Sequence, residues 1–419
     1  MRATIVIDVL LLRGSRYSTA TSLLRNTPFA LFWSSRVLST LALQIQTVAV
    51  GWQLYLLTGS ALDLGLVGLA QFVPTVVLTL IVGQVADRCD RRLVVVICHV
   101  VEGAAAGALA LGTVGGWLSR GGILAVVVVL GAARAFENPS RAALVPRLVP
   151  LGELSRAIAS VTAAGQMARI MGPALGGALL AWGPATAYAA VVGLYAVGGV
   201  LTALVRDSPP VRVREAITSA SLFSGVVFIF QRRLLLGLMS LDLFAVLLGG
   251  ATALLPIYAR DILDTGPGGL GLLRAAPAVG ALVMSAVLAR YPIGRNAGPM
   301  LFGSVLVFGV ATVIFGVSRD LGLSLVALGV LGGSDLLSMI IRQSLVQLRT
   351  PDGMRGRVSA VHSLFTGTSN QLGEFESGVL AALFGAVPAV LIGGIGTIVV
   401  VGLWMYRFPE LRRFELAGP

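Results

Sequence analysis

The ten residues GQVADRCDRR at positions 83–92 decide how this chain is interpreted. An apolar stretch lies on each side of them, at 62–85 and 93–115, and about 20 residues of helix are enough to cross the hydrocarbon core of a bilayer. A carboxylate such as Asp87 can accept hydrogen bonds from a neighbouring helix N-terminus, and arginines can pair with carboxylates on adjacent helices. The segment therefore predicts a charged connection between two membrane helices. It is either a latch that must break when this side of the bundle opens or simply one basic loop among several.

The composition of the whole chain agrees with a membrane protein. Of its 419 residues, 56% are hydrophobic and 12% are charged, which is about half the charged share of a soluble domain. A lipid-facing surface needs no charge, and the 52 glycines let membrane helices approach one another closely. The net charge of +12 comes from 31 basic residues, all of them arginine, in clusters between the apolar spans. We interpret this charge as a topology signal and predict no binding to nucleic acid.

Twelve apolar spans are long enough to cross a bilayer, so the chain is predicted to be an all-α membrane protein with twelve transmembrane helices. The longest connection divides them into two groups of six, as expected of two repeated halves. It contains an apolar run, Leu222 to Phe230, that is typical of a helix lying on the membrane surface. The predicted spans are 29–57, 62–85, 93–115, 121–144, 156–181, 185–205, 234–258, 268–289, 299–317, 321–342, 358–385 and 387–406.

The arginines between the spans fall almost entirely on one side of the membrane if the first span runs outward. The opposite side holds only Arg120, Arg260 and Arg319. Because basic loops stay in the cytoplasm, both termini are predicted to be cytoplasmic in a multi-pass protein of the bacterial inner membrane. The predicted segments are a cytoplasmic tail at 1–28, a six-helix bundle at 29–205, a cytoplasmic linker at 206–233, a second six-helix bundle at 234–406 and a cytoplasmic tail at 407–419.

The loop at 83–92 resembles the G-x-x-x-D-R-x-G-R-R/K signature of the major facilitator superfamily. Asp90 stands where a glycine is usual, which puts the tightness of that turn in question, although aspartate tolerates the left-handed conformation better than most residues. The resemblance implies that this loop is a conformational latch. The matching residues are Gly83, Asp87, Arg88, Arg91 and Arg92.

A second motif lies in the span 156–181. It resembles the G-x-x-x-G-P-x-x-G-G signature of major facilitator antiporters, with Ala168 in place of the first glycine. Proline removes a backbone donor and bends the helix, and the glycines permit tight contact with a helix of the other half. In the family the motif goes with export, whereas generic packing of small residues is the alternative interpretation. The matching residues are Gly172, Pro173, Gly176 and Gly177.

The run from Phe136 to Pro173 and the stretch from Thr350 to Val358 resemble the siderophore and drug exporter branch of the superfamily, which includes the enterobactin exporter. This resemblance covers about 26–410. It implies two pseudo-symmetric six-helix bundles and export of a small organic molecule, a siderophore or a lipophilic drug-like compound, by alternating access in exchange for protons. A non-transporting sensor and an importer of an organic anion are the alternatives. The expected partners are the substrate, protons and the lipid bilayer, and the chain is expected to be a monomer.

Ionisable residues inside the spans are the candidate cavity and coupling groups, because a charge in a membrane usually faces the bundle interior with a partner. Asp242 with Arg342 is one predicted gate pair, and Arg36 with Glu137 is the other. The full set of candidates is Arg36, Arg134, Glu137, Asp242, Asp335, Arg342 and Glu374. The candidates for carrying a proton are Glu137, Asp242, Asp335 and Glu374.

Arg134 stands where the family often places a cavity arginine linked to proton transfer. Glu137 lies three residues later on the same predicted helix and is its expected partner. Glu137 can instead receive Arg88 or Arg91 from the loop at 83–92. A structural ion pair is the alternative to a role in transport.

The sequence shows no sign of an enzyme. It contains no H-E-x-x-H metalloprotease motif and no G-x-x-x-x-G-K-[ST] nucleotide-binding loop. Cys89, Cys98 and His99 are close in sequence but lack the spacing of a zinc site, so we interpret them as ordinary helix-end residues. The chain is predicted to be a non-enzymatic protein with no metal and no cofactor.

Overall fold

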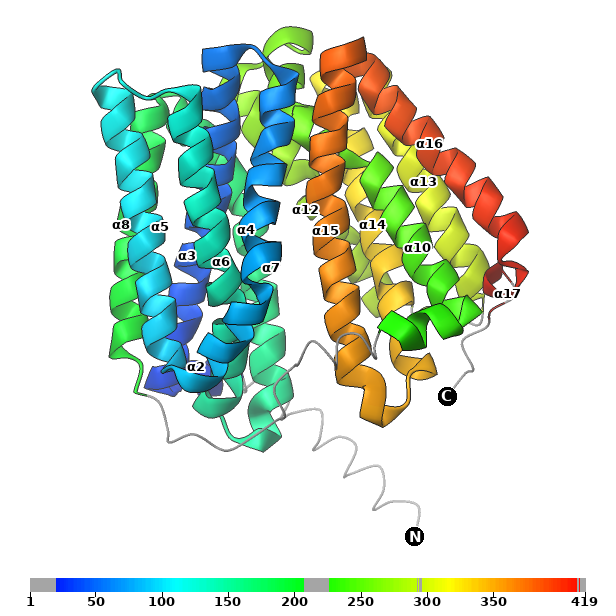
Figure 1. The fold of residues 1–419 in the computed structure, drawn as a ribbon, viewed down its shortest axis with the longest axis horizontal. Helices are drawn as coiled ribbons and strands as arrows, with labels where there is room; N and C mark the ends of the chain where they lie inside the picture. Colours follow the sequence, from blue (N-terminus) through cyan, green and yellow to red (C-terminus); the bar gives the residue numbers. More distant parts are fainter. Residues whose placement is uncertain (1–19, 207–225, 292, 294–295, 413, 415–419) are drawn as a thin grey trace, which may run out of the picture.

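The computed structural model describes residues 20–206, 226–291, 293, 296–412 and 414, and all regular structure within these ranges is helical. The long helices of the first half are α3 (Thr27–Thr58), α4 (Ala61–Arg88), α5 (Arg91–Val114), α6 (Arg120–Leu148), α7 (Leu154–Leu180) and α8 (Pro184–Leu204). Those of the second half are α10 (Arg233–Leu248), α12 (Gly266–Arg290), α13 (Ala297–Val317), α14 (Leu321–Arg349), α15 (Asp352–Phe384) and α16 (Ala386–Arg407). Each predicted span corresponds to one of these helices, if the short turns after α10 are included. The two halves stand side by side (Figure 1).

Ten of the described helical segments are long and apolar enough to cross a membrane by composition alone. The two long helices outside that set are α7 and α15, which lie at the contact between the halves: α7 packs on α12, and α15 packs on α4. A helix that is covered by other helices needs less apolar surface than one that faces lipid. The twelve long helices in two halves therefore form the all-α membrane fold that the sequence predicts.

The span predicted at 234–258 is not one continuous α-helix. After α10 the chain continues through η2 (Gly250–Leu254), α11 (Leu255–Ile257) and η3 (Tyr258–Ile262). A Cβ on Gly250 would lie only 2.6 Å from Ser377 Oγ of α15, so a larger residue would push the two segments apart. Glycine at the break therefore lets α15 approach the backbone closely.

The turn between α4 and α5 is built without the usual glycine. Asp90 has an extended backbone, with φ −62° and ψ 113°, and its Oδ1 accepts a hydrogen bond of 2.9 Å from the Arg92 backbone N–H. An aspartate at this N-cap position satisfies one of the unpaired amides at the start of the helix. The departure from the family signature thus caps α5, and no left-handed conformation is needed there.

The two halves touch at the end of the bundle opposite the chain termini. A Cβ on Gly65 of α4 would lie 2.9 Å from the Cα of Gly378 in α15, and a Cβ on Gly177 of α7 would lie 2.9 Å from the Cα of Gly271 in α12. Contacts this close exist only because both partners are glycines, which is how small residues join membrane helices. These two helix pairs hold the halves together.

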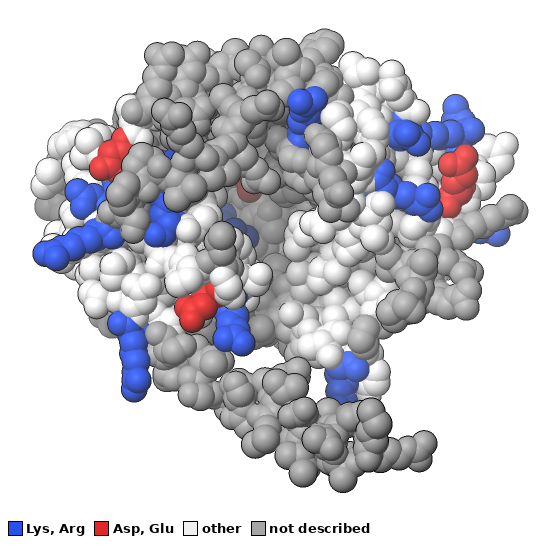
Figure 2. Space-filling model, turned by 90° about the horizontal axis from the view of Figure 1, so that it is seen from below, with Lys and Arg blue, Asp and Glu red and all other residues white. Residues whose placement is uncertain are grey.

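The same end carries a polar contact between the halves. The hydroxyl of Tyr55, near the end of α3, donates a hydrogen bond to Asp261 Oδ2, and the Arg260 guanidinium lies 5.5 Å from the centre of the Tyr55 ring. At the opposite end, where Figure 1 shows the two termini, the molecule is hollowed between the halves (Figure 2). The structure is therefore closed at the end that contains Thr58 and open at the end that contains the termini.

Part of the linker lies outside the described residues. The predicted surface helix at 222–230 falls partly in 207–225, which the structure does not describe, whereas 226–231 are helical and Ile229 is buried against the second half. Most of the two predicted tails is likewise outside the described ranges. The predicted segment boundaries remain predictions.

Candidate functional site

A polar cavity of about 420 Å³ lies among helices α3, α5, α6, α7 and α8 of the first half. This volume is within the range of sites for small organic molecules. The cavity is accessible to solvent, because the side chain of Arg169 on its wall is exposed. Its charged lining residues are Arg36, Glu102, Arg134, Glu137, Arg141 and Arg169.

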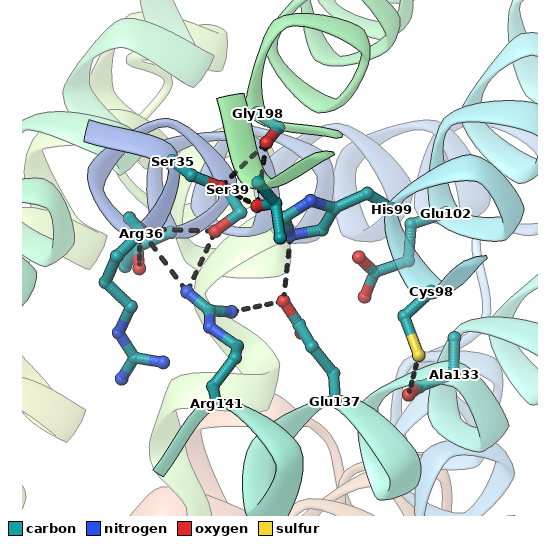
Figure 3. Close-up of polar contacts among 12 residues, drawn as sticks. Ser35, Arg36, Ser39, Cys98, His99, Glu102, Ala133, Glu137, Arg141 and Gly198 are labelled. Atoms are coloured by element: carbon teal, nitrogen blue, oxygen red, sulfur yellow. Dashed lines mark hydrogen bonds and ion pairs between the residues drawn. The ribbon is translucent and has the colours of Figure 1, made fainter. Parts of the chain in front are cut away.

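Glu137 is the centre of a buried network in this cavity (Figure 3). Its Oε1 accepts a hydrogen bond from Arg141 Nη1 and lies 3.1 Å from His99 Nε2. Arg141 Nη2 donates a second hydrogen bond, of 2.9 Å, to Ser39 Oγ of α3. Glu137, His99 and Arg141 are all less than 7% exposed. The network therefore joins α3, α5 and α6 through charged side chains at membrane depth.

Glu137 does not form the ion pair predicted with Arg36 or the one predicted with Arg134, whereas the alternative partner Arg88 has its side chain outside the described residues. Arg36 forms no ion pair with it among the described residues, since Figure 3 shows the Arg36 guanidinium pointing away with Arg141 between them. Arg134 does not pair with it either. Arg141 takes the position because it follows Glu137 by four residues, one helical turn along α6. The prediction missed this because it counted Arg141 with the basic residues of the cytoplasmic side, although the predicted span 121–144 contains it and α6 continues beyond it to Leu148.

Arg134 instead contacts one side chain of α4 and one of α5. Its Nη1 donates a hydrogen bond of 2.6 Å to Gln71 Oε1, and its Nε lies 4.0 Å from Glu102 Oε1. Glu102 is 1% exposed, and its Oε2 has no hydrogen-bond partner among the described residues. Glu102 is thus held less tightly than Glu137, although both are equally deep.

His99, Glu102 and Glu137 face one another, with their ligand atoms within 4.8 Å. Arginine guanidinium groups already lie beside both carboxylates, so positive charge is supplied by the chain itself. This arrangement is better suited to holding and exchanging protons than to binding a cation. The interpretation of His99 as an ordinary helix-end residue is wrong. The signal that could have found the cluster is the spacing of three residues between His99 and Glu102, which places both on one face of an otherwise apolar helix.

The second half contains the predicted pair of Asp242 and Arg342. Arg342 Nη2 lies 2.8 Å from Asp242 Oδ1, and both side chains are 4% exposed. Thr366 of α15 donates a longer hydrogen bond, of 3.3 Å, to Asp242 Oδ2. The pairing is confirmed as geometry, and its role as a gate remains a prediction.

The other two acidic candidates are not bonded to this pair, although Asp335 is near enough to act on both of its members. The Asp335 side chain is exposed and has no ion pair or side-chain hydrogen bond within the described ranges. Glu374 lies at the contact between the halves, because a Cβ on Gly68 of α4 would be 2.9 Å from Glu374 Oε2. Neither residue lines the polar cavity of the first half.

Two of the predicted latch residues are placed by the structure. Arg91 Nη1 donates a hydrogen bond of 3.3 Å to the Ala143 carbonyl of α6, and Arg92 Nη1 donates one of 2.8 Å to the Val205 carbonyl after α8. Carbonyls near helix C-termini attract cations. These contacts tie the loop to helices of its own half. The surroundings of Gly83 and the side chains of Asp87 and Arg88 are outside what the structure describes.

The glycines of the second motif divide their contacts between the halves. A Cβ on Gly172 would lie 2.5 Å from Gln44 Cβ, and a Cβ on Gly176 would lie 3.1 Å from Ile45 Cα, so these two pack on α3 of the same half. Gly177 packs on α12 of the other half, and the Pro173 carbonyl also faces α12. The predicted contact with the other half is therefore made by part of the motif only.

Comparisons with known proteins agree with this architecture. The family profile described as "Transmembrane secretion effector" matches residues 18–417. "Enterobactin exporter EntS" of Citrobacter koseri is 27% identical over 411 residues, which cover 95% of this chain and 96% of that protein. The protein of the same name from Escherichia coli O139:H28 is 26% identical over the same shares of both chains.

Solved structures of transporters share the fold. The nucleoside transporter NupG superposes with a TM-score of 0.70 at 15% identity, over 90% of this chain and 99% of that one. A bacterial homologue of the iron transporter ferroportin, in an inward-facing state, gives a TM-score of 0.70 at 18% identity, over 91% and 99% of the two chains. Because the family profile covers nearly the whole sequence, the chain belongs to the transmembrane secretion effector family of the major facilitator superfamily, and it is a multi-pass membrane transporter rather than an enzyme.

Proposed function

We propose that this transporter exports a small organic molecule from the bacterial cytoplasm by alternating access, in exchange for protons. Arginines flank the spans at the end that contains the termini, and such loops stay in the cytoplasm. The hollow between the halves opens at that end (Figure 2). In this orientation the protein lies in the inner membrane with both termini in the cytoplasm, and its cavity is ready to load cargo from inside.

The observation that carries the proposal is the buried cluster of His99, Glu102 and Glu137 on the wall of the cavity. Proton coupling needs a carboxylate whose affinity for protons changes as its surroundings alternate between water and protein. Glu102 meets this need best, because its Oε2 is unpartnered while Glu137 is held by Arg141 and His99. Glu102 therefore joins the four carboxylates predicted as proton carriers, and we place it first among them.

The cargo we favour is a siderophore or a lipophilic drug-like compound. The support is that the relatives named above are enterobactin exporters and match this chain over 95% of its length. The size of the cavity also suits an organic molecule rather than an inorganic ion. Enterobactin is accordingly the first compound to test.

The test uses everted membrane vesicles that contain the full chain. With an acid interior, enterobactin should accumulate in the vesicles, and its addition should release protons from them. Collapsing the proton gradient with an ionophore should abolish accumulation, and Glu410→Gln, which changes an exposed carboxylate outside the cavity, should have no effect. A non-transporting sensor would move neither enterobactin nor lipophilic dyes under any gradient. An importer would move them out of everted vesicles.

A further inference from the structure

Three arginines on the walls of the cavity region have no carboxylate in direct contact, although Glu137 acts on Arg36 and Glu374 acts on Arg274 from a greater distance. Arg36, Arg169 and Arg274 make no ion pair and donate no side-chain hydrogen bond within the described part of the chain. The Nε atoms of Arg36 and Arg274 are buried without an acceptor. By contrast, Arg134 and Arg141 in the same region bind Gln71, Glu102, Glu137 and Ser39.

These three arginines belong to both halves of the molecule. A second cavity, of about 220 Å³, is lined by Gln44 and Arg169 of the first half and by Thr252 and Arg274 of the second. Gln44 and Arg169 also line the larger cavity, whose wall includes Arg36. The two cavities therefore share a wall and lead from Arg36 in the first half to Arg274 in the second.

The charge of this region is unbalanced. Four arginines but only two glutamates line the larger cavity, and a further arginine lines the smaller one. An unpaired guanidinium inside a membrane protein is costly and usually marks a substrate or ion path. Guanidinium groups bind oxyanions through paired, charge-assisted hydrogen bonds.

We propose that the transported cargo is an organic anion whose oxyanion group binds Arg169 together with either Arg36 or Arg274. One group does not reach both Arg36 and Arg274 at once, because Arg274 lies beside Gly51, about four turns along α3 from Arg36. The proposal rests on the export function above and specifies the chemical class of its substrate. It also gives a physical reason for closure of the open end: positively charged walls from the two halves repel each other when empty, and a bound anion removes that repulsion.

The test measures binding to the purified full chain in lipid nanodiscs, with 2-naphthoate as the anionic probe and 2-naphthamide as its neutral analogue of similar shape. Binding is followed as the concentration-dependent rise in Tm. The variants are Arg36→Gln, Arg169→Gln and Arg274→Gln. The matched control is Arg290→Gln, which changes an exposed arginine on the same helix as Arg274 and outside both cavities. Because these substitutions remove unpaired charges, the ligand-free Tm should not fall, and Arg169→Gln alters an exposed side chain that folding does not require.

The expected result is saturable binding of 2-naphthoate that weakens by about tenfold or more in Arg169→Gln and in one of the two variants Arg36→Gln and Arg274→Gln. The Arg290→Gln protein should bind like the wild type, and 2-naphthamide should give no saturable shift. Equal binding of the two probes, or unchanged affinity in all three variants, would overturn the proposal. Competition by inorganic sulfate as strong as by 2-naphthoate would also overturn it, since the site would then not select an organic anion. No proton gradient is involved, so this result is independent of whether export is driven by protons.

Discussion

The first half joins its buried charges in a hydrogen-bonded network, whereas the second half has one close ion pair of buried side chains, Asp242 with Arg342, among the described residues. In the first half, Glu137 is bound by Arg141 and His99, and Glu102 lies next to this group with one oxygen unpartnered. In the second half, Asp242 and Arg342 bind each other directly, whereas Asp335 and His362 act on this pair only from a greater distance. The two halves thus have the same number of long helices, but their buried charged side chains are arranged differently.

This difference indicates different roles for the two halves. A single well-matched pair resists a change of protonation, because losing one partner leaves an uncompensated charge in a dry environment. A network with a loosely held carboxylate can gain or lose a proton while its other members keep their partners. We therefore assign proton coupling to the first half and a structural or gating role to the pair in the second.

The largest effect on stability is expected from breaking the pair in the second half. Arg342→Met leaves Asp242 buried without its partner, which should lower the free energy of unfolding by about 3–5 kcal/mol. The double variant Asp242→Leu/Arg342→Met should recover most of the loss. Thermal unfolding in nanodiscs measures both. If the single and double variants were equally unstable, the two side chains would not be coupled.

A smaller effect is expected from the network in the first half. Glu137→Gln should destabilise the protein by about 1–3 kcal/mol, because Arg141 loses its charged partner but keeps Ser39. Glu102→Gln is the matched control, since its carboxylate is equally buried but reaches only one arginine, at 4.0 Å. It should cost less than about 1 kcal/mol. The same unfolding assay distinguishes them, and a larger loss for Glu102→Gln would reverse the structural ranking of the two carboxylates.

The smallest loss of stability is expected from removing the hydroxyl group that is hydrogen-bonded to a buried charge in each half. Ser39→Ala removes the 2.9 Å hydrogen bond from Arg141, and Thr366→Val removes the 3.3 Å hydrogen bond to Asp242. Each should cost about 0.5–1.5 kcal/mol at most, and the shorter bond should cost more. The difference in Tm between these two variants measures how much each half depends on its hydroxyl. A larger fall in Tm for Thr366→Val than for Ser39→Ala would mean that the Asp242–Arg342 pair depends on its hydroxyl more than the length of that hydrogen bond indicates.

The fold could be predicted from the sequence because the bilayer imposes it. Spans of a fixed length, arginines on one side and a central break leave few alternatives. The break after α10 was not predicted, since it depends on how closely α15 approaches Gly250, and that is a long-range contact.

The site could be predicted only in part. Asp242 and Arg342 were paired correctly because both are charged residues near the cytoplasmic ends of their predicted spans, 234–258 and 321–342. The partner of Glu137 was missed because Arg141 was counted with the basic residues of the cytoplasmic side, although α6 runs through Pro139 and Pro146 to Leu148. Glu102 was overlooked although it lies in the predicted span 93–115, where a charge is expected to face the bundle interior with a partner. The identity of that partner, Arg134, depends on the packing of α5 on α6 and is not visible in the sequence.

The central claim is that the first half couples transport to protons through Glu102. It is tested most directly in proteoliposomes by comparing two fluxes of labelled enterobactin for Glu102→Gln: accumulation driven by a pH gradient, and exchange of labelled for unlabelled compound without a gradient. We predict that gradient-driven accumulation is lost while exchange is retained, because the carboxamide cannot carry the proton but leaves the cavity intact. Accumulation by the Glu102→Gln protein at the wild-type level would contradict the claim.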